Sequence, residues 1–212
     1  MKQSELNIIL EEHAKWLHHN STGKRADLSS ANLRYANLSK ANLIDANLRN
    51  ADLRDANLSR ADLRYANLTE ANLTDANLTY ANLSGADLRY ANLREANLSG
   101  ANLREADLSE ADLTYTGLSE ADLSEADLIG ADLRGAIGND REIKTLLTEF
   151  YHVTYTSDQM AIGCEQYAIT DWFKFDDKRI EAMDEHATEF WTLYKPILIT
   201  LININKKDQL ED

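Results

Sequence analysis

The chain has 212 residues but only one cysteine, Cys164, and one proline, Pro196. A single cysteine cannot form a disulfide within the chain, which favours a reducing compartment, and a single proline excludes a proline-rich linker. No apolar run approaches the roughly 20 residues that a membrane-spanning helix needs. Residues 1–6 also lack the long apolar segment of a secretory signal. We therefore expect a cytoplasmic protein that has no membrane partner.

Positive charge is scarce as well, because 22 Lys and Arg stand against 36 Asp and Glu, for a net charge of −14. Residues 26–135 hold 18 acids and 10 bases, and residues 136–212 hold 15 acids and 8 bases. Proteins that hold nucleic acid neutralise its phosphates with Lys and Arg, so this balance argues against direct binding of nucleic acid. An acidic protein instead favours basic protein partners, which include proteins that themselves hold nucleic acid.

What the sequence has in excess is a repeat of five residues, Ala-(Asp/Asn)-Leu-x-x, over residues 26–135. Leucine occupies every fifth position from Leu28 to Leu133, and the pattern departs from Ala-(Asp/Asn) only at Thr116-Gly117. A period of five fits neither an α-helix nor a flat strand, since the leucines would drift around the helix axis or alternate between the strand's faces. A backbone that turns by about 90° at each repeat would instead give coils of 20 residues and one continuous leucine core. We interpret Thr116-Gly117 as neutral sequence variation that does not disturb the coil, with a backbone kink or a ligand contact as the alternative.

The repeat resembles that of the pentapeptide-repeat family, whose fold is a right-handed quadrilateral β-helix. The resemblance implies a mainly β protein in which the leucines and the small residues before them point inward. We expect an N-terminal capping helix in residues 1–25, a β-solenoid in residues 26–136 and a small α+β C-terminal domain in residues 137–212. Function in such a fold depends on the outward-facing positions.

The N-terminal segment predicts a helix over residues 4–19 that covers the first coil, with Ser4 as its N-cap. Its apolar stripe follows helical spacing and consists of Leu6, Ile9, Leu10, His13 and Leu17. We interpret His13, His18 and His19 as residues of a solvated helix end and not as metal ligands.

The C-terminal part predicts two paired strands, residues 152–156 and 160–164, followed by three helices. Thr170 or Asp171 would cap the first helix, Asp176 or Asp177 would cap the second through Met183, and the third would run from about residue 185 to 202 with a kink or break at Pro196. We interpret the aromatic surface of this part as a cap, a dimer contact or a partner-docking face. The candidate residues are Trp172, Phe173, Phe190, Trp191 and Tyr194.

This C-terminal part, together with residues 10–17, resembles pentapeptide-repeat proteins of phages and prophages. The likeness rests on three short sequence motifs, Ile162-Gly163-Cys164, Met183-Asp184 and Phe190-Trp191. Relatives carry a histidine shortly after the first motif, where this chain has Tyr167. Cys164 with His152 or His186 is the one nucleophile–base candidate, and a small buried cysteine is the commoner role. We therefore expect no catalytic residue, no metal site, no cofactor and no enzyme activity.

One stretch of about a coil, from residue 105 to residue 127, holds eight acids and no Lys or Arg between them. These residues would form an acidic collar, which consists of Glu105, Asp107, Glu110, Asp112, Glu120, Asp122, Glu125 and Asp127. Some pentapeptide-repeat proteins mimic DNA and occupy the DNA site of type II topoisomerases. This chain shares the repeat and the acidity, but its shaft is short, arginines interrupt its acidic surface, and no loop is inserted between repeats.

We interpret the protein as a non-enzymatic protein-binding module. The first hypothesis is a phage-encoded DNA mimic whose collar inhibits a nucleic-acid enzyme in the cytoplasm of a bacterial host. The second is a rigid scaffold whose C-terminal domain recognises a partner, and the third is an assembly protein whose ends form homo-oligomers. The simplest interpretation of the outward positions is a soluble surface of interleaved charges with no binding role.

Overall fold

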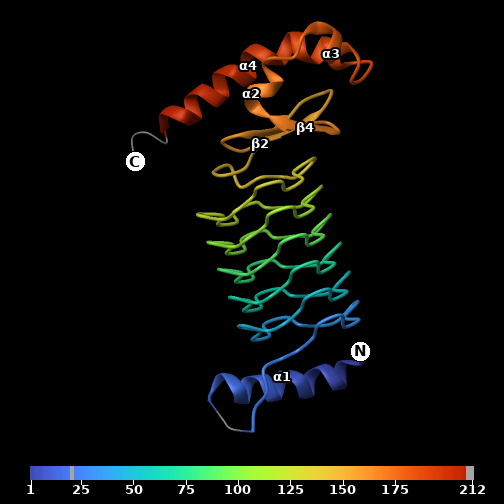
Figure 1. Cartoon of the computed structure of the whole chain (residues 1–212), viewed down its shortest axis with the longest axis vertical. Helices are drawn as coiled ribbons and strands as arrows, with labels where there is room; N and C mark the ends of the chain where they lie inside the picture. Colours follow the sequence, from blue (N-terminus) through green and yellow to red (C-terminus); the bar gives the residue numbers. More distant parts are fainter. Residues whose placement is uncertain (20–21, 209–212) are drawn as a thin grey trace.

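The computed structural model describes residues 1–19 and 22–208 of the chain. Helix α1 (Gln3–Leu17) precedes the repeats, which are followed by strands β1 (Lys144–Leu147), β2 (His152–Tyr155), β3 (Gln159–Ile162) and β4 (Glu165–Ala168), and then by helices α2 (Ile169–Trp172), α3 (Asp177–Glu181) and α4 (Ala187–Asp208). The repeats form a shaft with α1 across one end and the C-terminal elements on the other (Figure 1). None of the described helices is long and apolar enough to cross a membrane.

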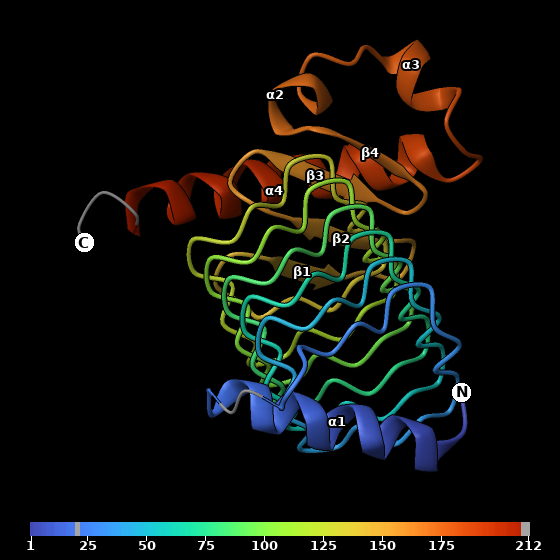
Figure 2. The same ribbon diagram turned by 60° about the horizontal axis from the view of Figure 1, so that its bottom comes forward.

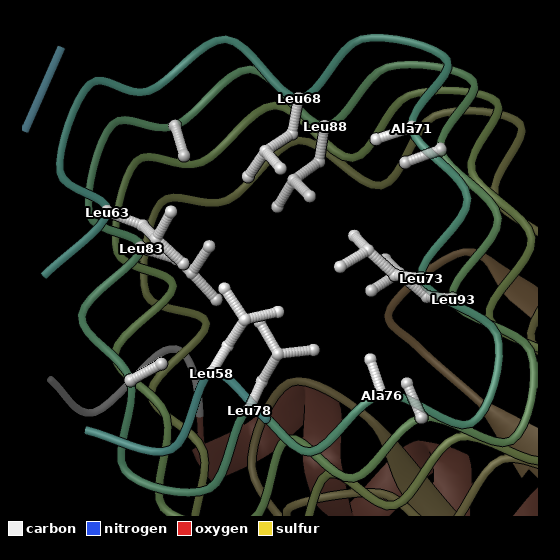
Figure 3. Packing of buried hydrophobic residues seen from close by; sticks show 14 of the residues in the cluster. Leu58, Leu63, Leu68, Ala71, Leu73, Ala76, Leu78, Leu83, Leu88 and Leu93 are labelled. Carbon is white, nitrogen blue, oxygen red and sulfur yellow. The ribbon is translucent and has the colours of Figure 1, made fainter. Parts of the chain in front are cut away.

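The shaft is a parallel β-helix in which four repeats make one coil. Its bridges join the second residue of each repeat to the residue 20 positions later, from Asp27 with Asn47 to Gly117 with Ile137. This confirms the coil of 20 residues, and Figure 2 shows its four sides. The leucines stack in four inward columns, such as Leu58 with Leu78 and Leu68 with Leu88 (Figure 3), and nearly all of them are completely buried.

The corner of each repeat explains why the sequence requires Asp or Asn before leucine. In the repeat of Leu58, Asn57 Oδ1 accepts from the backbone N–H of Ser59 at 3.0 Å, and Ala61 N–H donates to Leu58 O at 3.0 Å. The residue between them, Arg60, has φ of 59°, which costs a non-glycine residue about 1 kcal/mol or more. The side-chain bond of the Asp or Asn stabilises this corner, as in an Asx-turn.

The departure at Thr116-Gly117 leaves the coil intact. Thr116 takes the buried alanine position, and its hydroxyl donates to Leu93 O at 2.8 Å. Gly117 keeps its bridges to Asn97 and Ile137. The structure therefore has no kink at Thr116-Gly117, which agrees with the interpretation that this departure is neutral sequence variation.

Two glutamines each close one rung at an end of the backbone ladder. Inside the shaft, one residue of each rung both donates and accepts: Asn47 N–H donates to Ala26 O at 3.0 Å, and Asn47 O accepts from Leu28 N–H at 2.7 Å. The first coil has no coil beneath it, and there the Gln3 side-chain amide donates to Asn37 O and accepts from Asn37 N–H, both at 3.1 Å. An amide side chain thus takes the place of the peptide group of a missing coil.

The same device stands at the opposite end of the shaft. Gln166 Nε2 donates to Ala131 O at 2.7 Å, and Gln166 Oε1 accepts from Leu133 N–H at 3.0 Å. Two threonine hydroxyls, of Thr145 and Thr154, each donate to Ala136 O at 3.0 Å. The C-terminal elements are therefore hydrogen-bonded to the last coil and cover part of its edge.

Helix α1 differs from the expectation in two respects. It begins at Gln3 after Lys2, not after an N-cap at Ser4, because the Glu5 carboxylate accepts from the Lys2 backbone N–H at 3.0 Å. His13 is not at a solvated helix end, since it is completely buried with Leu6 against the first coil. Its Nδ1 accepts from the Ala26 N–H at 3.1 Å, and this bond links α1 to the first repeat.

The C-terminal part contains the expected antiparallel pair, β2 with β3, and adds β1 and β4 in a sheet of order β1-β2-β3-β4. Helix α2 begins at Ile169 after Ala168, so neither Thr170 nor Asp171 is its cap. Asp176 caps α3 as expected, but α3 ends before Met183. Helix α4 begins at Ala187 and is continuous through Pro196, so the expected break is absent.

Loss of the Gln166 amide should weaken the whole fold, because Ala131 O and Leu133 N–H would lose their partners. We expect Gln166→Leu to lower the free energy of unfolding by about 1–3 kcal/mol and Gln166→Glu, which keeps the acceptor, to lower it less. Urea unfolding followed by circular dichroism measures this. The control is Gln159→Leu, whose side chain makes no hydrogen bond in the described structure. Equal stability of the Gln166→Leu and Gln159→Leu variants would contradict the role of Gln166.

Acid should loosen the N-terminal cap through His13. Burial lowers the pKa of His13, and the nearby Ile44 carbonyl and Asp45 carboxylate oppose this only in part. In the unfolded chain His13 binds a proton near the ordinary pKa of about 6.5, whereas the folded chain resists protonation. The free energy of unfolding therefore keeps its full His13 contribution above that pH and decreases as the pH falls below it. In His13→Asn, which retains an acceptor, the free energy of unfolding should depend less on pH between 5 and 7. The exposed His18→Asn is the control and should behave as the unmodified protein.

Candidate functional site

The structure distributes the acidic collar unevenly around the shaft. One face carries the column Leu28, Leu48, Leu68, Leu88, Leu108 and Leu128, and we call it the Leu108 face. Asp107, Glu110 and Asp127 lie on this face, and Glu105 and Glu125 lie at the corners that lead into it. Asp112, Glu120 and Asp122 occupy the other sides. The collar is therefore a ring whose acids are concentrated on one side.

The eight acids also differ in their local role. The four aspartates hold corners as asparagines do elsewhere, with Oδ1 accepting from a backbone N–H two residues later at 2.9–3.0 Å. The four glutamates stand at corners with φ between 57° and 60° and are exposed. In Asp122, the Ser124 hydroxyl and N–H lower the pKa of the carboxyl group, so it remains ionised at neutral pH.

In a repeat that carries aspartate, the residue after leucine determines whether an arginine of the same repeat neutralises that aspartate. In the four Ala-Asp-Leu-Arg repeats, the arginine binds the aspartate of its own repeat. Arg89, for example, donates from Nε to Asp87 Oδ1 at 2.9 Å and from Nη2 to Oδ2 at 2.7 Å, and it lowers the pKa of Asp87. The collar aspartates are followed by Ser, Thr or Ile at that position, and no such pair forms within their repeats.

Arginines of the preceding coil reach part of the collar, which reading along the chain did not reveal. Arg89 lies 3.5 Å from Asp107, and Arg104 lies 4.0 Å from Asp122 and 3.5 Å from Glu125. Exposed pairs of this kind contribute at most about 1 kcal/mol. The remaining collar acids form no ion pair with any described residue and are Glu105, Glu110, Asp112, Glu120 and Asp127.

The aromatic candidates of the C-terminal part lie mainly in its core. Trp172, Phe190 and Trp191 are 2–6% exposed, and the Trp172 indole donates to Met160 O at 2.7 Å. They are not a docking face in this structure, because a small four-stranded sheet needs these side chains to cover it. Phe173 and Tyr194 remain half-buried at the edge of that core.

The apolar surface of this part is elsewhere, on α4. Leu193, Ile197 and Ile199 are 39–51% exposed, while Phe190, Trp191 and Leu198 of the same helix are buried. Helical periodicity across Pro196 is the signal that could have separated the two sides of α4.

The structure assembles no catalytic or metal constellation from the candidates of the sequence. Cys164 is exposed and free, and no described hydrogen bond joins it to His152 or His186. Within residues 1–19 and 22–208, no group of three or more His, Cys, Asp or Glu side chains could hold a metal ion.

This geometry defines a class of protein, a β-helix with four five-residue repeats in each coil. The chain belongs to the pentapeptide-repeat family, because the family model described as pentapeptide repeats matches residues 24–60, 56–94, 91–128 and 101–137. These matches cover the shaft and more than half of the chain.

One solved structure shows a similar fold over the shaft. The pentapeptide repeat protein Rfr23 from the cyanobacterium Cyanothece 51142 is 29% identical, with a TM-score of 0.52 over 53% of this chain and 90% of Rfr23, and this likeness implies a right-handed β-helix. HetL from the cyanobacterium Nostoc sp. strain PCC 7120 is 41% identical over 55% of this chain and 63% of its own, with a TM-score of 0.28. A comparison with curated proteins finds no match.

The corner role of the collar aspartates can be separated from their charge. In Asp112→Asn the amide oxygen should still accept from Thr114 N–H, so we expect a change in stability within about 0.5 kcal/mol. In Asp112→Ala that bond is lost, and the free energy of unfolding should fall by about 1 kcal/mol. Thermal unfolding of both variants measures the difference. Equal losses in the two variants would show that the charge itself stabilises the corner.

Proposed function

We propose that the protein is a protein-binding module without a catalytic role, whose acidic collar binds a basic surface of a nucleic-acid-binding enzyme. The observation that carries this proposal is the concentration of collar acids on and beside the Leu108 face. Glu105, Glu110 and Asp127 lie there without an ion pair in the described structure. Uncompensated charges on one side of a rigid shaft attract a partner of opposite charge and raise the rate of encounter.

The shaft holds these charges in a fixed arrangement. Asp107 and Asp127 are bridge partners on successive coils, so their backbones are about 4.8 Å apart along the axis. The glutamates project from corners whose backbone is fixed by hydrogen bonds such as that of Glu110 N–H to Ile129 O at 2.9 Å. A preorganised row of acids is the feature that a mimic of duplex DNA needs, since DNA carries about one charge per 1.7 Å of its axis.

We also propose a phage or prophage setting for this activity, which rests on the short sequence motifs of the C-terminal part. In that setting the protein would act in the cytoplasm of a bacterial host and compete with nucleic acid for an enzyme. The competition would be strongest at low salt, because exposed charge contacts are screened.

A scaffold or assembly role is the second candidate, and the exposed side of α4 favours it. Leu193, Ile197 and Ile199 offer apolar surface at the C-terminal end of the molecule, where α4 extends sideways past the shaft (Figures 1 and 2). Such a surface suits self-association or a protein partner. In this role the shaft would be a rigid spacer, and the collar would only keep the protein soluble.

Charge reversal on the Leu108 side should abolish the first activity. We expect Glu105→Lys, Glu110→Lys and Glu125→Lys together to reduce capture of a nucleic-acid enzyme from a bacterial lysate by at least about tenfold at low salt. Lys40 has φ of 59° at an equivalent corner, so lysine is compatible with this backbone. The matched control reverses Asp55, Asp75 and Glu95, which occupy the same position of the repeat at another corner of the shaft and change the net charge equally.

Two results would contradict the collar proposal. Capture that both triple variants reduce equally would indicate a response to net charge only. Capture that survives both reversals and high salt, but is lost in Leu193→Lys with Ile197→Lys, would assign recognition to α4. Light scattering then distinguishes a foreign partner from self-association, because the unmodified protein would be a dimer or larger in the second case.

A further inference from the structure

One rung of the last coil is left open by the C-terminal elements. Ala126 C=O and Leu128 N–H have no hydrogen-bond partner among residues 1–19 and 22–208. One coil below, the equivalent Ala106 C=O accepts from Asp127 N–H at 2.9 Å, and Leu108 N–H donates to Asp127 O at 2.8 Å. The Gln166 amide closes the neighbouring rung at Ala131 and Leu133 but does not reach this one.

The open rung faces a cavity of about 560 Å³ between the last coil and the C-terminal sheet. Its walls are the coil segment 123–133, the start of β1, the β2–β3 turn and Ile202 of α4. Ala126 and Leu128 line it and are half-buried, whereas most other alanines and nearly all other leucines of the repeat are fully buried. The cavity therefore exposes both backbone groups and core side chains of the solenoid.

The geometry of the shaft specifies what fits on this edge. In the rungs between two Ala-(Asp/Asn)-Leu repeats, one residue of the upper coil makes both backbone bonds, its side chain points outward, and its two neighbours stack over the Ala and Leu columns. An added strand would therefore place a small residue over Ala126, an outward residue over Asp127 and an aliphatic residue over Leu128.

Charge decides the outward residue of that strand. Among the described residues, the cavity is lined by the carboxylates of Glu125, Asp127, Glu142 and Asp158 and by two bases, Arg141 and Lys144. Asp127 has no ion pair with any described residue, so Lys or Arg is the residue that it favours. A second copy of this edge would oppose acid with acid, and charge therefore disfavours pairing of two chains through it.

We infer that the edge at Ala126–Leu128 binds an extended peptide segment of a partner protein by strand addition, through a triplet of a small, a basic and an aliphatic residue. The backbone N–H of the basic residue would donate to Ala126 O, and its backbone carbonyl would accept from Leu128 N–H. Asp127 makes the same two bonds to Ala106 and Leu108 of the coil below it. This inference deepens the proposed function, since Glu125 and Asp127 belong to the acidic collar and the edge ends the Leu108 face.

The test uses the full chain, labelled with ¹⁵N, and the peptide Ac-Thr-Ser-Ala-Lys-Leu-Ser-Thr-NH2. In the free protein the Leu128 amide should exchange quickly with solvent, and the Leu108 amide, which is bonded at the same position one coil below, should exchange slowly. We expect saturable shifts at residues 126–129 on titration and slower exchange at Leu128. A copy of the peptide N-methylated at the lysine nitrogen should bind at least about tenfold more weakly, because that N–H is the donor to Ala126 O.

Matched protein variants separate charge from fold. Asp127→Asn should weaken binding of the lysine peptide about threefold, because asparagine retains the corner bond to Ile129 N–H but has no charge. Asp27→Asn makes the same change in the first coil and should leave binding unchanged. A peptide with glutamate in place of lysine should not saturate.

Three outcomes would overturn the inference: no saturable shift at residues 126–129, equal binding of the N-methylated peptide, or a dimer in light scattering whose interface protects Leu128 without peptide. Loss of peptide binding with persistent collar-dependent capture would reject the edge and leave the proposed function intact. Peptide binding without collar-dependent capture would reject the proposed function and leave the edge.

Discussion

The backbone hydrogen bonds between successive coils, which join residues 19 and 21 positions apart, are the interaction on which the rest of this structure depends. Each coil satisfies the backbone groups of the coil below, so the interior needs nothing beyond the five-residue rule. The two ends have no such neighbour, and unpaired backbone groups at a sheet edge are costly or promote aggregation. The chain meets this problem with side chains that imitate a peptide group, Gln3 at one end and Gln166 at the other. His13, Thr145 and Thr154 satisfy further edge groups, which explains why the capping elements are placed where they are.

The periodic part of the molecule was predictable because its cause is local and repeated. Leucine at every fifth residue and Asp or Asn before it require a turn at each repeat, and the structure confirms the coil of 20 residues. The C-terminal hairpin and the Asp176 cap were also predictable, since alternating apolar residues and a carboxylate before a helix act within a few residues. Strands β1 and β4 were missed because their segments are only half-buried and lack a clear alternation.

The features that the sequence did not reveal depend on contacts between residues that are more than ten positions apart. His13 looked like a residue of a solvated helix end until α1 placed it against Ala26. The aromatic residues Trp172, Phe190 and Trp191 looked like a surface because nothing in the sequence shows which side of α4 the sheet covers. The collar looked free of bases because Arg89 and Arg104 precede their collar partners by about a coil in sequence, yet both lie beside those partners in space.

The same ladder explains why uncompensated acid gathers at the C-terminal end of the shaft. An acid in the interior has one coil below it and one above it, and arginines on either can approach, as Arg34 approaches Asp55 and Arg49 approaches Glu70 from the coil below. Asp127 belongs to the last coil, and Glu110 lies beneath Gly130 of that coil, which carries no charged side chain. The coil that would bring an arginine to Asp127 does not exist on the Leu108 face. Missing backbone partners and missing counter-charges are thus one consequence of ending the solenoid there, and a partner strand that carries a base would supply both.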